Sequence, residues 1–309
     1  MVKTEYDFIV NPKARSGMGE MIWRTLEPEL KKQRVPYRVH MTAGKKHAEE
    51  TARALTADGR EHTLVVLGGD GTVNETVNGI RSLEKTVLGY IPIGSSNDFA
   101  RGLGLPKEPK AALRTVLHPQ KVIRMDVGVL GGGGRSRRFL VSAGMGFDAA
   151  VCHEVCISRW KVLLNKLGLG KLSYAVVALH RLVKDRPVHM TITLPDGTSR
   201  EFPGTYFAAF MNLPYEGGGF RFCPEASPED GMLDIIVAHG LSMPKILCLL
   251  PLAFGGKHTG FQGVTILRSG SVRAEAETVL ALHTDGEPGF PRKTIQAGLE
   301  KEKLRVIAG

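Results

Sequence analysis

The chain has 309 residues, of which 42% are hydrophobic and 23% are charged. This length exceeds what a single hydrophobic core usually organises, so it predicts two globular domains. No apolar run approaches the roughly 20 residues that span a bilayer, and four cysteines do not make a disulfide framework in a chain of this length. The N-terminus has no apolar segment followed by a cleavage site, which leads us to expect a cytoplasmic protein.

The charge of the chain points to the class of its partner. A formal net charge of +10 at pH 7 favours a polyanion, which can be a nucleic acid, an anionic lipid surface or a nucleotide. The sequence has none of the aromatic RNA-binding strands, paired Cys/His fingers or basic heptads that are typical of nucleic-acid-binding folds. We therefore expect no nucleic-acid partner.

The first 122 residues alternate short apolar strands with helical segments. Strands are expected at 6–12, 37–42, 62–69 and 87–94, and helices at 19–34, 46–57 and 73–83. This alternation predicts an α/β domain with a mostly parallel sheet covered on both faces. Ligands of such sheets lie beyond the carboxyl ends of the strands. The Gly- and Asn-rich segments fall at those ends: NPKARSG (11–17), GGDGT (68–72) and GSSND (94–98).

From residue 123 onward the pattern changes to short strands joined by turn sequences such as PDG and EDG. This predicts a mainly antiparallel β-domain over residues 123–290, with a helical insertion at about 149–184 and a shorter one near 244–254. The four glycines at 131–134 are interpreted as a hairpin connection. The last strand-like segment is expected to return to the first domain, so that residues 291–309 complete it.

The stretch VVLGGDGTVNETV (65–77) places three glycines between an apolar strand and a helix. Their amides can converge on an anion at the helix N-terminus, and glycine leaves room for its approach. Asp70 could bind the magnesium ion of a nucleotide or take a proton from an attacking hydroxyl. The alternative is a tight turn in which Thr72 caps the helix and Glu75 completes a capping box.

Six segments, in this order, resemble the diacylglycerol kinase catalytic family, in particular its bacterial lipid kinases, which are related to sphingosine kinases and NAD kinases. They cover nearly the whole chain: NPKARSG (11–17), GGDGTVNE (68–75), PIGSSNDFAR (92–101), GMGFDA (144–149), EASPEDGMLD (225–234) and HTDGE (283–287). The resemblance implies an NAD kinase/diacylglycerol kinase-like α/β domain followed by an antiparallel β-sandwich domain.

The resemblance also implies a nucleotide site for ATP in the first domain. Ser95 stands where the family has threonine and keeps the hydroxyl. The residues that match the family's nucleotide contacts are Asn11, Pro12, Ser16, Gly17, Thr42, Gly68, Gly69, Asp70, Gly71, Thr72, Asn74, Ser95, Asn97 and Asp98.

Two later motifs match the family's metal site and its general base. SPEDGMLD (227–234) resembles a structural Mg²⁺ site formed by the side chain matching Asp230 and the backbone carbonyls matching Ser227 and Met232, and an ordinary Asp-Gly turn is the alternative. In HTDGE, Glu287 matches the base that takes the proton of the lipid hydroxyl. Asp70 is the other candidate base, and a solvated turn is the alternative interpretation of Asp285 and Glu287.

Residues 157–187 place basic side chains among leucines, with Asp185 as the one acid. This composition suits an anionic membrane surface, so we expect peripheral membrane association. The alternative is a helical pair that packs on the β-domain and exposes a basic face to water. The sequence leaves a homodimer open.

Together, these resemblances imply a Mg²⁺-requiring lipid kinase that transfers the γ-phosphoryl group of ATP to the hydroxyl of diacylglycerol or a similar lipid. The product would be phosphatidic acid or another lipid phosphate. Two alternatives stay open: a kinase of a soluble substrate such as NAD, and an inactive nucleotide-binding regulator.

Overall fold

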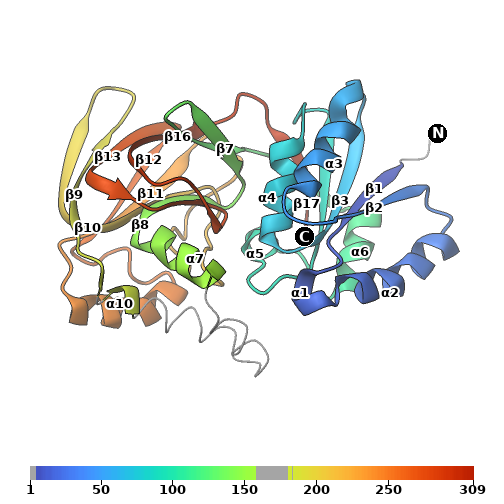
Figure 1. Ribbon diagram of the computed structural model, residues 1–309, viewed down its shortest axis with the longest axis horizontal. Coiled ribbons are helices and arrows are strands. Elements are labelled where there is room, and N and C mark those ends of the chain that lie inside the picture. Colours follow the sequence, from blue (N-terminus) through green and yellow to red (C-terminus); the bar gives the residue numbers. More distant parts are fainter. Residues whose placement is uncertain (1–4, 158–179, 183) are drawn as a thin grey trace. The chain divides into compact units, whose positions relative to one another are not determined.

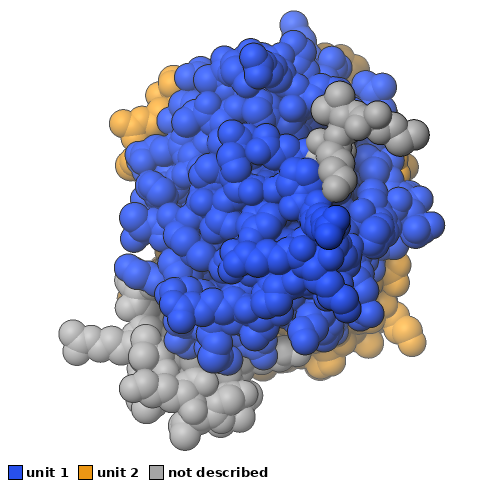
Figure 2. All heavy atoms as spheres, turned by 90° about the vertical axis from the view of Figure 1, so that its right-hand side faces the viewer, with its two compact units in different colours: residues 1–127, 300–309 blue, residues 128–299 orange. Residues whose placement is uncertain are grey.

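The computed structural model describes residues 5–157, 180–182 and 184–309. They form two compact units, Met1–Val127 with Glu300–Gly309 and Gly128–Leu299, which are coloured separately in Figure 2. The sequence analysis set the corresponding boundaries at residues 122 and 290. Most of the helical insertion expected at about 149–184, and most of the basic segment at 157–187, lie outside the described residues. No described helix is both long enough and apolar enough to cross a membrane.

Unit 1 is built on a six-stranded sheet with the strand order β2-β1-β3-β4-β17-β5 (Figure 1). All neighbouring strands are parallel except β17 and β5, which are antiparallel. The strands are β1 (Tyr6–Val10), β2 (Tyr37–Met41), β3 (His62–Gly68), β4 (Thr86–Pro92), β5 (Lys121–Met125) and β17 (Leu304–Ala308). The helices are α1 (Ala14–Gly17), α2 (Gly19–Lys32), α3 (His47–Leu55), α4 (Asp70–Gly79), α5 (Asp98–Gly102) and α6 (Pro109–Leu117), with a 3₁₀ turn at Thr56–Asp58.

Hydrophobic burial holds the helices on this sheet. Helix α2 repeats apolar residues at a spacing of three to four, and its Trp23 packs against Phe8 of β1 with ring centroids 5.1 Å apart. Strand β3 is apolar on both faces, as expected for a buried parallel strand. Val65 faces the core shared with α2 and α6, and because side chains alternate along a strand, Leu64 and Val66 face the other side. This packing fixes the carboxyl ends of β1, β3 and β4 at one edge.

Helix α4 starts earlier than the sequence predicts. It begins at Asp70 rather than near Val73, with Gly69 at the N-cap position. Thr72 therefore lies inside the first turn, and the Glu75 carboxylate accepts the backbone N–H of Lys46 (2.8 Å) instead of closing a capping box. The capping-box alternative is wrong, and the GGDGT segment forms the start of a helix.

Unit 2 is an antiparallel β-structure, and its described strands make one branched sheet of eleven strands. The long strand β10 pairs with β9 along its first half and with both β8 and β11 along its second half. The sheet branches there, so that Met190, Phe210 and Ile235 share one core. The strands are β6 (Gly128–Gly132), β7 (Arg135–Phe139), β8 (Ser142–Gly146), β9 (Val188–Thr193), β10 (Ser199–Met211), β11 (Leu233–His239), β12 (Val264–Ser269), β13 (Ser271–Leu280), β14 (Leu282–Thr284), β15 (Glu287–Pro288) and β16 (Arg292–Leu299).

Two helices of unit 2 follow strands directly or after a short turn: α7 (Phe147–Ile157) after β8 and α10 (Met243–Phe254) after β11. The glycines at 131–134 join β6 to β7 as an antiparallel hairpin, as predicted. Gly133 and Gly134 have φ of 58° and 76°, a backbone conformation that favours glycine. No helix starts there, in agreement with the hairpin interpretation.

Candidate functional site

The first part of the candidate site lies where β1 and β3 of unit 1 end. The backbone N–H of Asn11 donates to the carbonyl of Leu67 (2.9 Å), and its side-chain Nδ2 donates to Thr72 Oγ1 (3.1 Å). The N–H of Thr42 donates to the carbonyl of Val10 (2.8 Å). Three of the predicted nucleotide residues, Asn11, Thr42 and Thr72, are therefore held at one edge of the sheet.

The GGDGT and PIGSSND segments approach each other through their backbones. The N–H of Ile93 donates to the carbonyl of Gly68 (2.9 Å). A Cβ added to Gly94 would lie 2.7 Å from the Cα of Gly69, and one added to Gly69 would lie 3.2 Å from the Cα of Gly94. These glycines are required for the contact between the two loops, a cause that the sequence analysis did not identify.

Asn97 shapes the second of these loops. Its Oδ1 accepts from the N–H of Gly94 (2.9 Å) and from the hydroxyl of Tyr90 (3.1 Å), while its Nδ2 donates to the Gly94 carbonyl (2.8 Å). Its φ of 52° is a left-handed conformation that asparagine tolerates. The Asn97 side chain is therefore used within the loop, whose Ser95 is exposed.

Asp70 joins the starts of two helices. Its Oδ2 accepts from the N–H of Asp98 (3.2 Å), and its Oδ1 accepts from the N–H of Phe99 (3.3 Å), the first residues of α5. Asp98 in turn accepts from Arg101 Nη1 (2.6 Å). Burial, and then the charges of Asp70 and Asp98, raise the pKa of Tyr90 well above its ordinary value. Both predicted acids thus lie beside the same buried phenol.

The remaining predicted nucleotide residues lie in two places. Asn74 is buried, and its carbonyl accepts from Asn78 Nδ2 (2.8 Å). Pro12 lies between β1 and α1, and Ser16 and Gly17 end α1, where they are exposed and have φ of 58° and 92°.

In unit 2, the HTDGE segment forms the tight hairpin of β14 and β15. Asp285 has a φ of 50°, and its carboxylate accepts the backbone N–H groups of Leu140, Val141 and Ser142 at 2.8 to 3.2 Å. A solvated turn is therefore the wrong interpretation for Asp285, because its side chain anchors the hairpin. Glu287 is half-buried and follows this turn as the first residue of β15.

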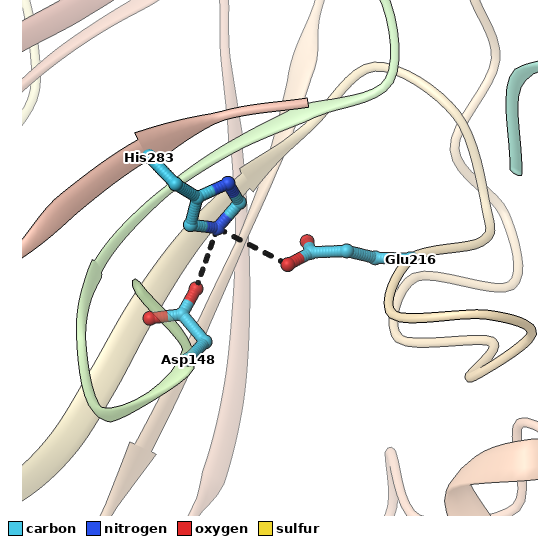
Figure 3. Close-up of side chains that lie close together, drawn as sticks. All are labelled: Asp148, Glu216 and His283. Carbon is cyan, nitrogen blue, oxygen red and sulfur yellow. Dashed lines mark hydrogen bonds and ion pairs between the residues drawn. The ribbon is translucent and has the colours of Figure 1, made fainter. Parts of the chain in front are cut away.

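A buried group of ionisable side chains lies beside this hairpin (Figure 3). His283 Nε2 is 3.1 Å from Asp148 Oδ2 and 3.1 Å from Glu216 Oε1. The histidine side chain is 0% exposed, and each acid is 8% exposed. Burial raises the pKa of Asp148, although the His283 hydrogen bond opposes the shift. Burial lowers the pKa of His283, but the Glu216 carboxylate and its other neighbours outweigh it and raise that pKa well above 6.5.

The sequence analysis did not assign these three residues a joint role. Asp148 lies within GMGFDA and His283 within HTDGE, and Glu216 lies in none of the recognised motifs. They meet because β14 pairs with β8, so that His283 lies opposite Gly144. A Cβ on Gly144 would be 1.9 Å from Asp148 Oδ2 and 2.2 Å from His283 Nε2. The first glycine of GMGFDA is thus the sequence feature that could have indicated this cluster, because its missing side chain leaves room for Asp148 and His283 above the strand.

The predicted metal motif forms a turn closed by a salt bridge. Asp230 Oδ1 accepts the N–H of Met232 (3.0 Å), and Asp230 Oδ2 pairs with Arg268. Arg268 Nε lies 3.3 Å from Oδ1 of Asp234, its cross-strand partner. A hard cation held by Asp230 and the carbonyls of Ser227 and Met232 would share the carboxylate with a guanidinium that already neutralises it. The oxygen donors are of the type that Mg²⁺ prefers, but Arg268 already supplies the positive charge beside Asp230 that the ion would supply.

Among the described residues, Asp148, Glu216 and His283 are the group whose ligand types could hold a metal ion, with their ligand atoms within 4.8 Å of one another. The hydrogen bond at Nδ1, the other imidazole nitrogen of His283, argues against metal binding by this group. Gly286 N–H donates to His283 Nδ1 (3.2 Å), so this nitrogen carries no proton. A metal-bound imidazole normally donates from its second nitrogen. In the tautomer seen here, Nε2 carries the proton and donates to the carboxylates.

Two known protein-family models together match most of the chain. Residues 5–130 match the model of the diacylglycerol kinase catalytic domain, and residues 141–307 match that of the YegS C-terminal NAD kinase beta sandwich-like domain. The chain belongs to the diacylglycerol kinase catalytic-domain family. This confirms the family resemblance and the two-part fold class that the sequence predicts. Membership supports a lipid kinase activity in general, with ATP as the phosphoryl donor of a kinase.

Relatives and a solved structure agree with this membership. The chain is 31% identical over 285 residues to a Bacillus subtilis (strain 168) protein named "Putative lipid kinase YtlR", covering 91% of this chain and 92% of that protein. It is 31% identical over 246 residues to a diacylglycerol kinase of the same organism, covering 78% and 76%. The crystal structure of a diacylglycerol kinase from Bacillus anthracis str. Sterne has the same fold, with a TM-score of 0.72 at 22% identity and coverage of 99% and 97%.

Proposed function

We propose that this member of the family transfers the γ-phosphoryl group of ATP to the hydroxyl of diacylglycerol or a similar lipid, giving phosphatidic acid or another lipid phosphate. One observation carries the proposal: the GGDGT and PIGSSND loops are in contact. Gly69 packs against Gly94, and the Asp70 carboxylate accepts the N–H groups that follow the second loop. Their polar groups gather at the carboxyl ends of β3 and β4, where α/β sheets bind ligands.

Unit 1 would bind the nucleotide. The first turn of α4 begins at Asp70, and the N-terminus of a helix attracts phosphate through its N–H groups and its dipole. Asn11 and Thr72, hydrogen-bonded to each other, would border the phosphate chain. Mg²⁺ accompanying ATP would neutralise charge on the transferred group. Asp70 would hold this ion, because carboxylate oxygens are ligands that Mg²⁺ prefers.

Glu287 of unit 2 would act as the general base. It would take the proton of the lipid hydroxyl while that oxygen forms its bond to the γ-phosphorus and the bond from phosphorus to the ADP oxygen breaks. A positioned base contributes about 10²- to 10⁴-fold to such a rate. Asp70 is the weaker candidate because two backbone N–H groups already bind its carboxylate and hold it at the start of α5.

A membrane is the partner that suits helix α10. Its sequence MPKILCLLPLAF contains one charged residue, Lys245, and only Ala253 is buried. Leu247 is 43% exposed and Phe254 is 54% exposed. A mostly apolar, exposed helix with a basic residue and no acid favours an anionic lipid surface, since apolar side chains enter the interface and the lysine meets the headgroups. A protein whose substrate lies in a bilayer needs such a contact.

A kinase of a soluble substrate is the second candidate, because the C-terminal family model is described as NAD kinase beta sandwich-like. The test is phosphorylation of diacylglycerol in vesicles beside phosphorylation of NAD, with labelled ATP and Mg²⁺. We expect a labelled lipid product. Labelled NADP without a lipid product would overturn the proposal, and no product from any substrate offered would favour the inactive nucleotide-binding regulator.

A further inference from the structure

The hairpin that carries Glu287 is held from two sides. On one side, the Asp285 carboxylate binds the N–H groups of residues 140–142, and the N–H of Asp285 donates to the carbonyl of Ser142 (2.8 Å). On the other side, His283 Nδ1 accepts the N–H of Gly286 (3.2 Å) inside the turn itself. Gly286 is the residue directly before Glu287, so this second bond fixes the Asp285–Gly286 peptide, one residue before the base.

The His283 ring is itself held by groups from separate segments (Figure 3). Asp148 comes from the first turn of α7 and Glu216 from the loop after β10. The loop is closed by two backbone hydrogen bonds between Glu216 and Phe220, each 2.9 Å long, which fix the position of the acid. Both carboxylates meet the same nitrogen at 3.1 Å. The ring therefore cannot rotate without breaking contacts to two fixed elements.

Hydrogen-bond chemistry assigns the proton on the imidazole. A backbone N–H can only donate, so Nδ1 must be the acceptor and Nε2 must carry the proton. Nε2 therefore donates toward two buried carboxyl groups, which would otherwise repel each other. The groups that face the ring are Asp148 and Cys152 from α7 and Glu216 from the loop. One further proton shared between the carboxyl groups removes the repulsion.

We propose that His283 is a positioning residue for Glu287: clamped through Nε2 by Asp148 and Glu216, it uses Nδ1 to fix the Gly286 peptide and so the direction of the base. This inference rests on the proposed function, because it needs Glu287 to be the base. It gives the buried cluster a role that requires no metal ion. It also explains why the acids, histidine and glycines of GMGFDA and HTDGE occur together in one chain.

Two substitutions at residue 283 separate the two hydrogen bonds. His283→Asn keeps an oxygen near the position of Nδ1 that can accept from Gly286, but it loses the donor to the acids. His283→Gln keeps an N–H near the position of Nε2, but it loses the acceptor for Gly286. Glu216→Gln combined with His283→Asn removes the repulsion that the first variant leaves. The readouts are kcat and KM for ATP on lipid vesicles, together with the midpoint of thermal unfolding.

The proposal predicts a lower kcat for His283→Gln than for the double variant His283→Asn with Glu216→Gln. We expect His283→Gln to lower kcat about 10- to 100-fold, in line with the cost of displacing a catalytic group, with KM for ATP within twofold of the parent value. His283→Asn with Glu216→Gln should keep kcat within about fivefold, because the Gly286 bond survives. Equal kcat values for the two variants, or a KM for ATP that changes in parallel with kcat, would overturn the inference. A parent protein without lipid kinase activity would instead contradict the proposed function, and the inference with it.

Discussion

Asp70 accepts the backbone N–H of Phe99 at 3.3 Å and thereby ties the start of α4 to the start of α5. The same carboxylate binds the N–H of Asp98. One aspartate thus connects two loops that the sequence analysis treated as parallel contributions to a nucleotide site. Its loss is expected to affect the shape of both.

Substitution of Asp70 therefore tests whether the carboxylate acts through its charge or its shape. Asp70→Asn retains one oxygen acceptor for the α5 amides, whereas Asp70→Ala retains none. We expect Asp70→Asn to keep the thermal midpoint within about 3 °C and to lower kcat at least tenfold, because its charge toward Mg²⁺ is lost. Asp70→Ala should also weaken ATP binding, measured by calorimetry. Unchanged kcat in Asp70→Asn would remove Asp70 from the proposed site.

Gly144 is predicted to be essential for the stability of unit 2. Gly144→Ala would place a methyl group 1.9 Å from Asp148 Oδ2, and the neighbouring His283 leaves no room for the acid to move. We expect a loss of about 1–3 kcal/mol or more in the free energy of unfolding, as for other overpacked cores. The matched control is Gly260→Ala in the same unit, where an added Cβ meets nothing within 4 Å. Equal stability of the two variants in denaturant titrations would contradict the described cluster.

The pH dependence of stability follows from the raised pKa of Asp148. The folded chain keeps a proton that the unfolded chain releases above its ordinary pKa of 3.8, so the contribution of this group is present at low pH and is lost as pH rises through the folded value. Asp148→Asn fixes the uncharged form of residue 148. The thermal midpoint of this variant minus that of the parent should therefore increase between pH 5 and pH 8, and a constant or decreasing difference would be inconsistent with a retained proton.

Helix α10 is predicted to mediate contact with anionic lipid. Leu247→Asp and Phe254→Asp each remove an exposed apolar side chain and add a charge that anionic headgroups repel, so vesicle binding in flotation assays should weaken at least tenfold. Val279→Asp is the matched control, because Val279 is 64% exposed on β13 of the same unit. If the α10 variants changed only the oligomeric mass in light scattering, the helix would be an interface between copies. If they left vesicle binding equal to that of the control, the membrane assignment would be wrong.

The architecture of unit 1 could be predicted because its strands are short, apolar and separated by periodic helices. Helices α5 and α6 were not predicted, β5 (Lys121–Met125) crosses the boundary set at residue 122, and α4 was expected at 73–83 instead of Asp70–Gly79. The start of α4 was misplaced because glycine disfavours helix interiors, yet the N-cap and the first turn tolerate Gly69 and Gly71, since the N–H groups there need no intrahelical partner. The pairing of Asp70 with α5 was not predictable, since it depends on the contact of Gly69 with Gly94.

The buried cluster of unit 2 shows the opposite case. Asp148, Glu216 and His283 come from three segments whose neighbourhood is set by long-range antiparallel register, which single-sequence patterns do not specify. The same holds for Arg268, which meets Asp230 and Asp234 because β12 lies beside β11. The HTDGE motif indicated the end of a strand, but the role of Asp285 as an anchor required the structure.

The central claim is that Glu287 is the base of a lipid kinase, and the direct test is the rate of phosphoryl transfer from labelled ATP to diacylglycerol in anionic vesicles by the parent and by Glu287→Gln. The account predicts labelled phosphatidic acid from the parent, and a kcat about 10²- to 10⁴-fold lower in the variant with KM for ATP within twofold of the parent value. A variant as active as the parent, or a parent that phosphorylates NAD and not the lipid, would contradict it.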